Sequence, residues 1–226
     1  MRKILGCLQP TYLPWIPFFE RIILSDIFVI LDDVQFSKNS NHNRNYIKSN
    51  SKKLLLTVPI ISESNRMISD IKIDNKKNWK KKHWYSILQT YGKSNFFKQI
   101  KNELEFIYSK DWEFLSSLNI EIIKLFIKYL NIKSEIYISS EIDVKGTSNQ
   151  KLINICKYFN VDKFIVKKNT EHYHPKKQFL DNNIEFKYFS NKMIEYNQQG
   201  NNFVPGLSII DYISNCGPSL NKKLIK

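Results

Sequence analysis

Short apolar runs alternate with segments of helical periodicity along this chain, and this alternation restricts the fold more than any other feature. Apolar runs of this length are typical of strands that are buried on both faces, as in a parallel sheet. The strands that we expect on this basis lie at Ile4–Leu8, Ile27–Leu31, Ile136–Ile138, Lys163–Val166 and Glu185–Tyr188. The pattern predicts an α/β fold, with a mostly parallel sheet and helices on both faces in a Rossmann-like arrangement.

The same pattern predicts Leu54–Val58 as the third strand along the chain and Ile71–Ile73 as a short one, and both are counted with the same sheet. Helices that connect the strands are expected at Phe18–Leu24, Gln150–Phe159, Lys177–Asn182 and Leu207–Ser214. Three consecutive helices fill the middle of the chain, at Trp79–Thr90, Phe96–Tyr108 and Trp112–Leu130. We therefore divide the chain into an α/β core, residues 1–75 and 131–226, and a helical insertion or subdomain, residues 76–130.

Composition sets the broad class of protein. The chain has 226 residues, of which 42% are hydrophobic, so it can bury a substantial core. Its apolar runs fall short of the roughly 18 consecutive apolar residues that a membrane-spanning helix needs, so no membrane span is expected. Cys7, Cys156 and Cys216 are an odd number of cysteines without a CxxC spacing, which indicates reduced thiols and a cytoplasmic location. Whether the chain forms a homodimer is left open.

The net charge of +14 has a compositional explanation. Lys, Asn and Ile are abundant and Ala is absent, which is the pattern of an AT-rich genome. The lysines are scattered in small groups, whereas a nucleic-acid-binding protein needs them on one face. Nucleic acid is therefore disfavoured as a partner, and a phosphorylated small molecule is preferred.

Polar residues follow several of the predicted strands. In an open parallel sheet, ligands bind beyond the carboxyl ends of the strands. The residues at these positions are Gln9 and Thr11, Asp32 and Asp33, Ser139 and Ser140, and His172, Tyr173 and His174. The sequence therefore predicts a polar ligand-binding rim at one edge of the sheet.

The loop after the first strand, "QPTYLPW", contains prolines at positions 10 and 14, and a third follows at position 17. Proline fixes φ and lowers the entropy that a loop loses on ordering, which suits a loop that holds a ligand in one geometry. We assign Gln9, Tyr12 and Trp15 to ligand binding, and we expect Phe18 and Phe19 to be core residues.

A second polar stretch, "LDDVQFSKNSNHNRNYI", begins at residue 31. A carboxylate directly after a buried strand is costly unless it is paired or used, so Asp32 and Asp33 are candidates for chemistry. Arg44 could donate to a carboxylate or phosphate, although a structural Asp–Arg pair would explain the same residues. The neighbouring amide residues that we add to the binding site are Gln35, Asn43 and Asn45.

These residues carry a resemblance to a known family. The stretch from Gln9 to Lys48 is similar to the start of the WbqC-like family of bacterial proteins. The similarity continues through "KHW" at residues 82–84, "SS" at 139–140 and "FVPGLSIIDYISNCG" at 203–217. Pro17 and Asn41 stand where family members commonly have Gly and Trp. The resemblance implies a role in O-antigen or other surface-polysaccharide clusters, and it brings no settled reaction.

The residues themselves favour some reactions over others. The cysteines lie in apolar segments or lack a neighbouring base, so covalent catalysis is disfavoured. Two histidines spaced as in His172-x-His174 are a weak metal signal, and we expect no metal requirement. Direct acyl transfer needs only a base, a donor to the carbonyl group and positioning groups. His83, Asp32 and Asp33 are the candidate bases.

His83 lies in "WKKKHWYSI", residues 79–87, where Trp79, His83 and Ile87 share one helical face. Nearby lysines, including Lys82, are expected to disfavour protonation of His83 and to keep it a neutral base. A histidine in an aromatic core stripe is the alternative interpretation.

The sequence thus predicts an enzyme of surface-polysaccharide sugar biosynthesis. The reaction that we favour is N-acylation of a nucleotide-linked amino sugar by an activated acyl donor. The alternatives are a nucleotidylyltransferase-like or adenylate-forming enzyme, and a non-catalytic protein that binds a sugar nucleotide.

Overall fold

The computed structural model describes residues 3–38, 40–61, 66–169, 173–190, 195–200, 202–218 and 220. Its main sheet has five strands in the order β7-β2-β1-β8-β9. All four pairs of neighbouring strands are parallel. The strands are β1 (Ile4–Leu8), β2 (Ile27–Ile30), β7 (Glu135–Ile138), β8 (Lys163–Lys167) and β9 (Glu185–Phe189). The order reverses between β1 and β8, which places the topological switch point between these two strands.

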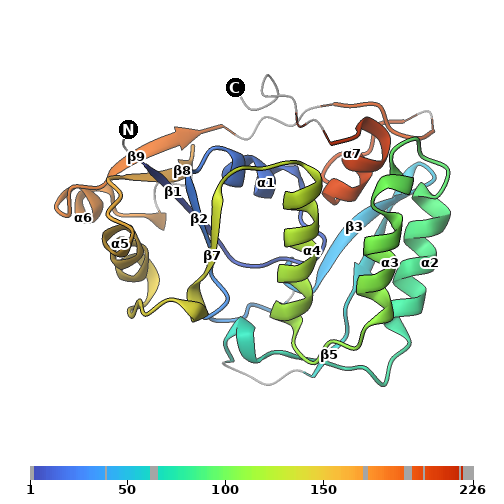
Figure 1. The fold of residues 1–226 in the computed structure, drawn as a ribbon, viewed down its shortest axis with the longest axis horizontal. Helices are drawn as coiled ribbons and strands as arrows, with labels where there is room; N and C mark the ends of the chain where they lie inside the picture. Colours follow the sequence, from blue (N-terminus) through green and yellow to red (C-terminus); the bar gives the residue numbers. More distant parts are fainter. Residues whose placement is uncertain are drawn as a thin grey trace.

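Helices cover both faces of this sheet (Figure 1). The side chains of β1 and β2 divide between two hydrophobic clusters because successive residues of a strand point to opposite faces. One cluster joins Phe28 and Ile30 to α1 (Ile16–Ile23) and α4 (Leu115–Tyr129). The other joins Leu5 and Val29 to α5 (Ser148–Tyr158) and α6 (Lys176–Leu180). The predicted α/β class and the cover on both faces are confirmed.

A β-hairpin stands apart from the main sheet. β3 (Arg44–Ser49) pairs with β4 (Lys52–Thr57) in antiparallel register, and Asn50 takes a φ of 52° at the turn. The expected strand at residues 54–58 therefore exists, but it does not belong to the parallel sheet, and β3 was not anticipated. Four of the six residues of β3, RNYIKS, are polar and its two apolar residues are adjacent, so neither an apolar run nor an alternating pattern marks it as a strand. β5 (Ile60–Ile61) and β6 (Lys72–Ile73) form a second short antiparallel pair.

The helical middle consists of α2 (Trp79–Tyr91), α3 (Lys101–Ser109) and α4. The single helix expected at residues 96–108 is broken, because residues 97–99 form a 3₁₀ turn before α3 begins. Side chains of the hairpin, of these three helices and of α7 (Ile209–Cys216) share one hydrophobic cluster. The boundary drawn at residues 76 and 130 stays a prediction.

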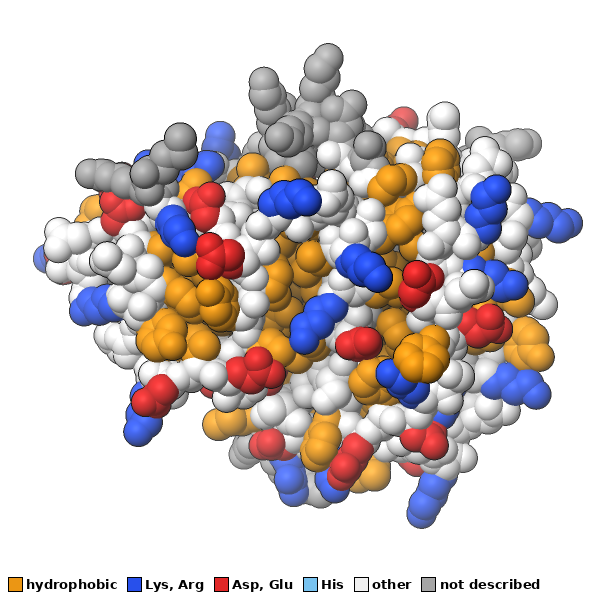
Figure 2. Space-filling model, viewed as in Figure 1, with side chains coloured by type: hydrophobic (Ala, Val, Ile, Leu, Met, Phe, Trp, Pro, Cys, Tyr) orange, Lys and Arg blue, Asp and Glu red, His pale blue; other side chains and the backbone are white. Residues whose placement is uncertain are grey.

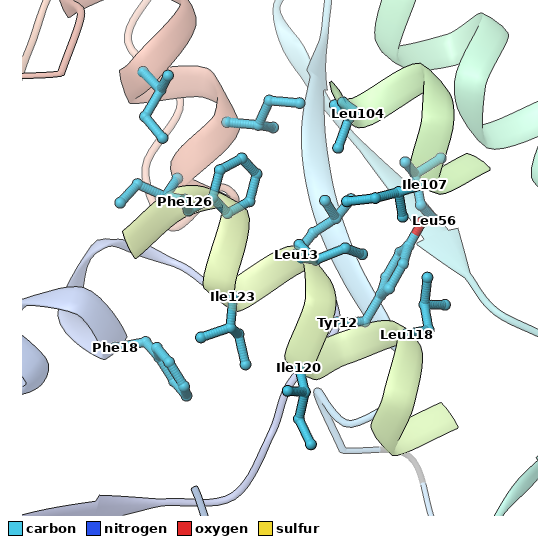
Figure 3. Packing of buried hydrophobic residues seen from close by; sticks show 14 of the residues in the cluster. Tyr12, Leu13, Phe18, Leu56, Leu104, Ile107, Leu118, Ile120, Ile123 and Phe126 are labelled. Atoms are coloured by element: carbon cyan, nitrogen blue, oxygen red, sulfur yellow. The ribbon is translucent and has the colours of Figure 1, made fainter. Parts of the chain in front are cut away.

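The loop between β1 and α1 is packed into this cluster. Tyr12 and Leu13 have no exposed surface, and Figure 3 shows them between side chains of α4, such as Leu118, and side chains of the hairpin and α3, such as Leu56. Leu13 has a φ of 44°, a conformation that is unfavourable for a leucine and that its surroundings must hold in place. Three hydrogen bonds do so: Tyr12 N to Asn41 O, Asn45 Nδ2 to Leu13 O and Ile209 N to Pro14 O.

Charges of both signs are interspersed on the face of the molecule in Figure 2, so the lysines form no single basic stripe there. Exposed ion pairs of the described residues include Lys72 with Glu113 and Lys3 with Glu135. Within the described ranges, every helix is too short or too polar to cross a membrane.

Candidate functional site

Two pairs of polar residues meet at the carboxyl edge of the sheet because β2 and β7 are parallel neighbours. Asp32 and Asp33 follow β2, and Ser139 and Ser140 follow β7. Asp32 is 4% exposed and accepts hydrogen bonds from Ser140 N at 3.0 Å, Ser140 Oγ at 2.7 Å and Ser139 Oγ at 3.2 Å. Ser139 Oγ is still closer to Asp33 Oδ1, so its one hydroxyl proton is shared between the two carboxylates. The structure thus joins four of the predicted site residues.

A lysine that the sequence did not reveal completes this group. Lys151 lies on the first turns of α5, its side chain is 6% exposed, and its ammonium group forms an ion pair with the carboxylate of Asp33. We call Asp32, Asp33, Ser139, Ser140 and Lys151 the rim cluster. Among the many lysines of the chain nothing marks this one, except that it follows "GTSNQ", whose glycine and hydroxyl residues are typical of a helix start.

A pocket of about 520 Å³ opens beside the rim cluster. Asp33, Gln35 and Lys151 lie on its wall together with the residues that precede and begin α5, Gly146 to Ser148. Gly146 has a φ of 120°, and a Cβ atom there would lie 3.3 Å from the backbone nitrogen of Lys151. A helix N-terminus together with a buried lysine is an arrangement that favours anionic groups such as phosphate.

The loop after β8 reaches the same end of α5. Asn149 donates from Nδ2 to the backbone oxygen of Tyr173 at 3.2 Å, and its Oδ1 lies 2.8 Å from His174 Nδ1. The Tyr173 side chain is 67% exposed and is therefore accessible to a ligand. His172 lies outside the described residues.

The first loop contacts a histidine that the sequence reading missed. Gln9 Oε1 lies 2.8 Å from Nε2 of His42, which is 3% exposed and whose pKa burial lowers to about 4. Oγ1 of Thr11 is buried and has no hydrogen-bond partner among the described residues. The roles of Gln9 and Thr11 in substrate binding stay predictions.

Several other predicted binding residues support the loop and the hairpin. Asn43 donates to Val58 O at 2.9 Å, and Asn45 donates to Leu13 O at 2.7 Å. Arg44 begins β3 opposite Thr57, so the proposed Asp–Arg pairing is replaced by the observed pair of Asp33 with Lys151. A role in substrate binding for Asn43, Arg44 and Asn45 stays a prediction.

His83 occupies a different place from the rim cluster. It is 6% exposed on α2, with Nδ1 2.8 Å from the hydroxyl oxygen of Tyr12, and that hydroxyl also bonds to Tyr108. The pKa of His83 is lowered to about 4, as the prediction of a neutral imidazole requires, but burial rather than neighbouring lysines is the main cause. Lys82, which directly precedes His83 on α2, is exposed.

Tyr12 and Trp15, two residues of the first loop that we assigned to ligand binding, differ in their exposure. Tyr12, which we assigned to ligand binding, has no exposed surface, so packing accounts for it in this structure. Trp15 is 39% exposed and forms an isolated β-bridge with Ser208. Phe18 and Phe19 are buried, as predicted for core residues.

The three cysteines are free thiols. Cys7 and Cys156 are buried, and burial raises the pKa of Cys156 to about 12 and also raises the pKa of Cys7. Thiols with raised pKa values are weak nucleophiles at neutral pH. Cys7 and Cys156 are therefore poor candidates for a nucleophile, as predicted from the sequence.

Comparisons with known proteins cover almost the whole chain. The family model described as "WbqC-like protein family" matches residues 9–223. A protein of Mycobacterium tuberculosis (strain ATCC 25618 / H37Rv), "Uncharacterized protein Rv1507c", is 27% identical over 221 residues, which is 96% of this chain and 95% of that protein. No solved structure matches significantly.

Proposed function

This chain belongs to the WbqC-like protein family, and from that premise we propose that it N-acylates the amino group of a nucleotide-linked amino sugar. The observation that carries the proposal is the pocket at the carboxyl edge of the sheet, where Asp33 lies beside Lys151 and the start of α5. The helix N-terminus and Lys151 provide the positive potential that a nucleotide diphosphate needs. Asp33 provides the one carboxylate on the pocket wall among the described residues.

In this reaction the amine nitrogen attacks the acyl carbon of the activated donor. A C–N bond forms, the bond between the acyl carbon and the leaving group breaks, and the leaving group keeps the electron pair of that bond. Asp33 takes the proton that the nitrogen loses. Ser139 Oγ and Lys151 hold the Asp33 carboxylate in place, because one contacts each of its oxygens.

Of the three candidate bases, the geometry supports Asp33. His83 is buried beneath Trp79, Tyr108 and Tyr12, and it is not among the residues that line the pocket. Asp32 already accepts three hydrogen bonds and is 4% exposed. Asp33 has a side chain that is 23% exposed, so it can meet a substrate amine.

A nucleotidylyl-transfer reaction is a second candidate. The order of the parallel strands and the helix N-terminus beside Lys151 would suit a nucleotide triphosphate as well as a sugar nucleotide. In that reaction, the oxygen of a sugar phosphate attacks the α-phosphorus of the triphosphate and pyrophosphate leaves. Release of pyrophosphate therefore separates the two functions.

The test uses the purified chain with a panel of amino sugars linked to UDP or dTDP and a panel of acyl-coenzyme A donors. Mass spectrometry should detect a sugar nucleotide whose mass has increased by that of the acyl group. A thermal-shift measurement with the same sugar nucleotides, without donor, tests binding alone. The proposal fails if no panel member is acylated and none raises the melting temperature.

A matched pair of variants on α5 tests the pocket itself. Lys151→Met removes the buried cation at the pocket, whereas Lys157→Met removes an exposed cation from the same helix. The first variant should lose the thermal shift caused by sugar nucleotides, and the second should keep it. Equal loss in both variants would mean that binding depends only on overall charge.

A further inference from the structure

A second cavity lies in the other half of the molecule, away from the sheet. Its volume is about 590 Å³, within the range of roughly 300–1,000 Å³ that is usual for small-molecule sites. It opens between the β3–β4 hairpin, α2, the segment before α7 and α7 itself. Figure 1 shows these elements together at the side opposite α5 and α6.

Hydroxyl and amide groups dominate the wall of this cavity. They come from Ser51, Ser86, Thr90, Asn50, Gln89 and Gln199. Such groups can donate and accept hydrogen bonds, so they complement a ligand that is itself rich in hydroxyl groups. A wall of this kind offers little to an apolar ligand.

Two buried charged residues also belong to the wall, Lys48 with 2% exposure and Asp211 with none. The ammonium group of Lys48 is already used, because it donates to the backbone oxygens of Gln199 and, at 2.7 Å, Asn202. The backbone of Lys48 is held as well, by the hydroxyl groups of Tyr91 and Thr90. The lysine therefore fixes the segment before α7 against β3, and two of its three N–H donors are used for this.

Asp211 differs from Lys48 because its hydrogen bonding is incomplete. Its Oδ2 accepts from Tyr196 Oη at 2.8 Å, but Oδ1 is buried and has no hydrogen-bond partner among the described residues. A carboxylate oxygen without a donor in a buried position costs free energy, so a ligand that supplies a donor would be favoured there. Asp211 belongs to the "SIID" stretch that the proposed reaction leaves without a role.

We propose that this cavity is a second ligand site, which binds a saccharide whose hydroxyl or amino group donates to Asp211. The hydroxyl and amide groups of the wall contact the remaining hydroxyl groups of the sugar. A ligand that donates hydrogen bonds is preferred to an anion, because the oxygen without a partner belongs to a carboxylate and two of the three donors of Lys48 already bind backbone oxygens. The proposal does not depend on the reaction at the rim pocket.

The test is a titration of the ¹⁵N-labelled chain with glucosamine, N-acetylglucosamine and, as an anionic comparison, inorganic phosphate. One of the two sugars should cause saturable shifts in the amide signals of residues 48–51, 89–91 and 199–200, and none at residues 33–35 or 146–151. Phosphate should leave the first group unchanged. No saturable shift with either sugar, or saturation of this cavity by phosphate, would overturn the proposal.

Asp211→Asn keeps the shape of the side chain but puts a donor or a weaker acceptor in place of the carboxylate. The affinity for the sugar should fall about 10- to 100-fold, as expected for a hydrogen bond to a charged group. Unchanged affinity in a folded Asp211→Asn variant would contradict the assignment.

Because a change at a buried position can prevent folding, a second pair of variants leaves the interior alone. Ser51→Trp should block the mouth of the cavity from an exposed position of the hairpin turn and abolish the sugar-induced shifts. Ser109→Trp, at the exposed end of α3, is the control and should bind as the unaltered chain does. Binding that survives Ser51→Trp would place the sugar elsewhere.

Discussion

The two halves of this molecule bury carboxylates in different ways. At the sheet edge, Asp32 accepts three hydrogen bonds and Asp33 is held by Ser139 and Lys151. In the half built on the hairpin and α7, Asp211 is fully buried, yet one of its oxygens has no partner among the described residues. The carboxylates of Asp32 and Asp33 are thus already held by donors of the protein, whereas that of Asp211 still lacks one.

The surroundings of Asp211 also change its ionisation. Burial raises the pKa of Asp211, whereas the hydrogen bond from Tyr196 and, to a smaller extent, the nearby hydroxyl group of Tyr91 and the charge of Lys48 oppose that rise. A group in this state gains from any further donor. The rim cluster suits chemistry on a bound substrate, whereas the site at Asp211 suits recognition. Five measurements test this contrast.

The largest effect is expected from Asp33→Asn. If Asp33 takes the proton from the attacking amine, turnover should fall by about 10² to 10⁴, whereas Asp70→Asn, an exposed control, should keep full activity. Steady-state rates of the acylated product measure the effect. Near-normal turnover in Asp33→Asn would return the role of base to His83 or Asp32.

The next largest effect is expected on the free energy of unfolding, from a change at the buried carboxylate of Asp32. Asp32→Asn should lower the free energy of unfolding by roughly 2 to 3 kcal/mol, because donors from Ser139 and Ser140 lose a charged acceptor. Urea unfolding at pH 7 measures it. A variant as stable as the unaltered chain would mean that these hydrogen bonds contribute nothing net.

Asp211→Asn is the counterpart of that variant and should cost less stability at pH 7. Because the pKa of Asp211 is raised in the folded state, the folded chain binds this proton more tightly than the unfolded chain does. Stability should therefore gain a contribution as the pH falls through the raised pKa, and Asp211→Asn should lack it. The same pH dependence in both proteins would contradict a raised pKa.

A further effect concerns the pH dependence of stability that arises from the buried histidines. The pKa of His83 is lowered from 6.5 to about 4, so between these values the unfolded chain is protonated and the folded chain is not. Stability should fall with pH in this window, by about 2 kcal/mol between pH 7.5 and 4.5 for this residue. In His83→Gln that loss should shrink by the same amount, while His42 still contributes its own.

The smallest effect is expected from an exposed ion pair. Lys80 contacts Asp111, whose side chain is 85% exposed, so solvent screens the pair. Asp111→Asn should change the free energy of unfolding by less than about 1 kcal/mol. A larger loss than in Asp32→Asn would show that burial does not decide the contribution of a carboxylate in this chain.

Local sequence patterns were sufficient to predict the class of fold and most of its elements. β1 begins and ends where its apolar run does, and of the seven expected strands five form the parallel sheet and two belong to antiparallel pairs outside it. The hydrophobic periodicity that marks a helix or strand can be seen within a few residues, because the geometry of the element alone decides which of its side chains share a face. The carboxyl-edge rule then placed Asp32, Asp33, Ser139 and Ser140 together without any structure.

Only the tertiary structure decided which distant side chains complete those groups. Lys151 is 118 residues from Asp33, and His83 is 71 residues from Tyr12, so no local pattern announces either contact. β3 packs in a hairpin and contacts α2 and α7, and these contacts bury even Lys48, which no pattern in the sequence predicts. Packing removed Tyr12 from the surface and left Asp211 without its second donor, because both outcomes depend on elements that meet only after the chain has folded.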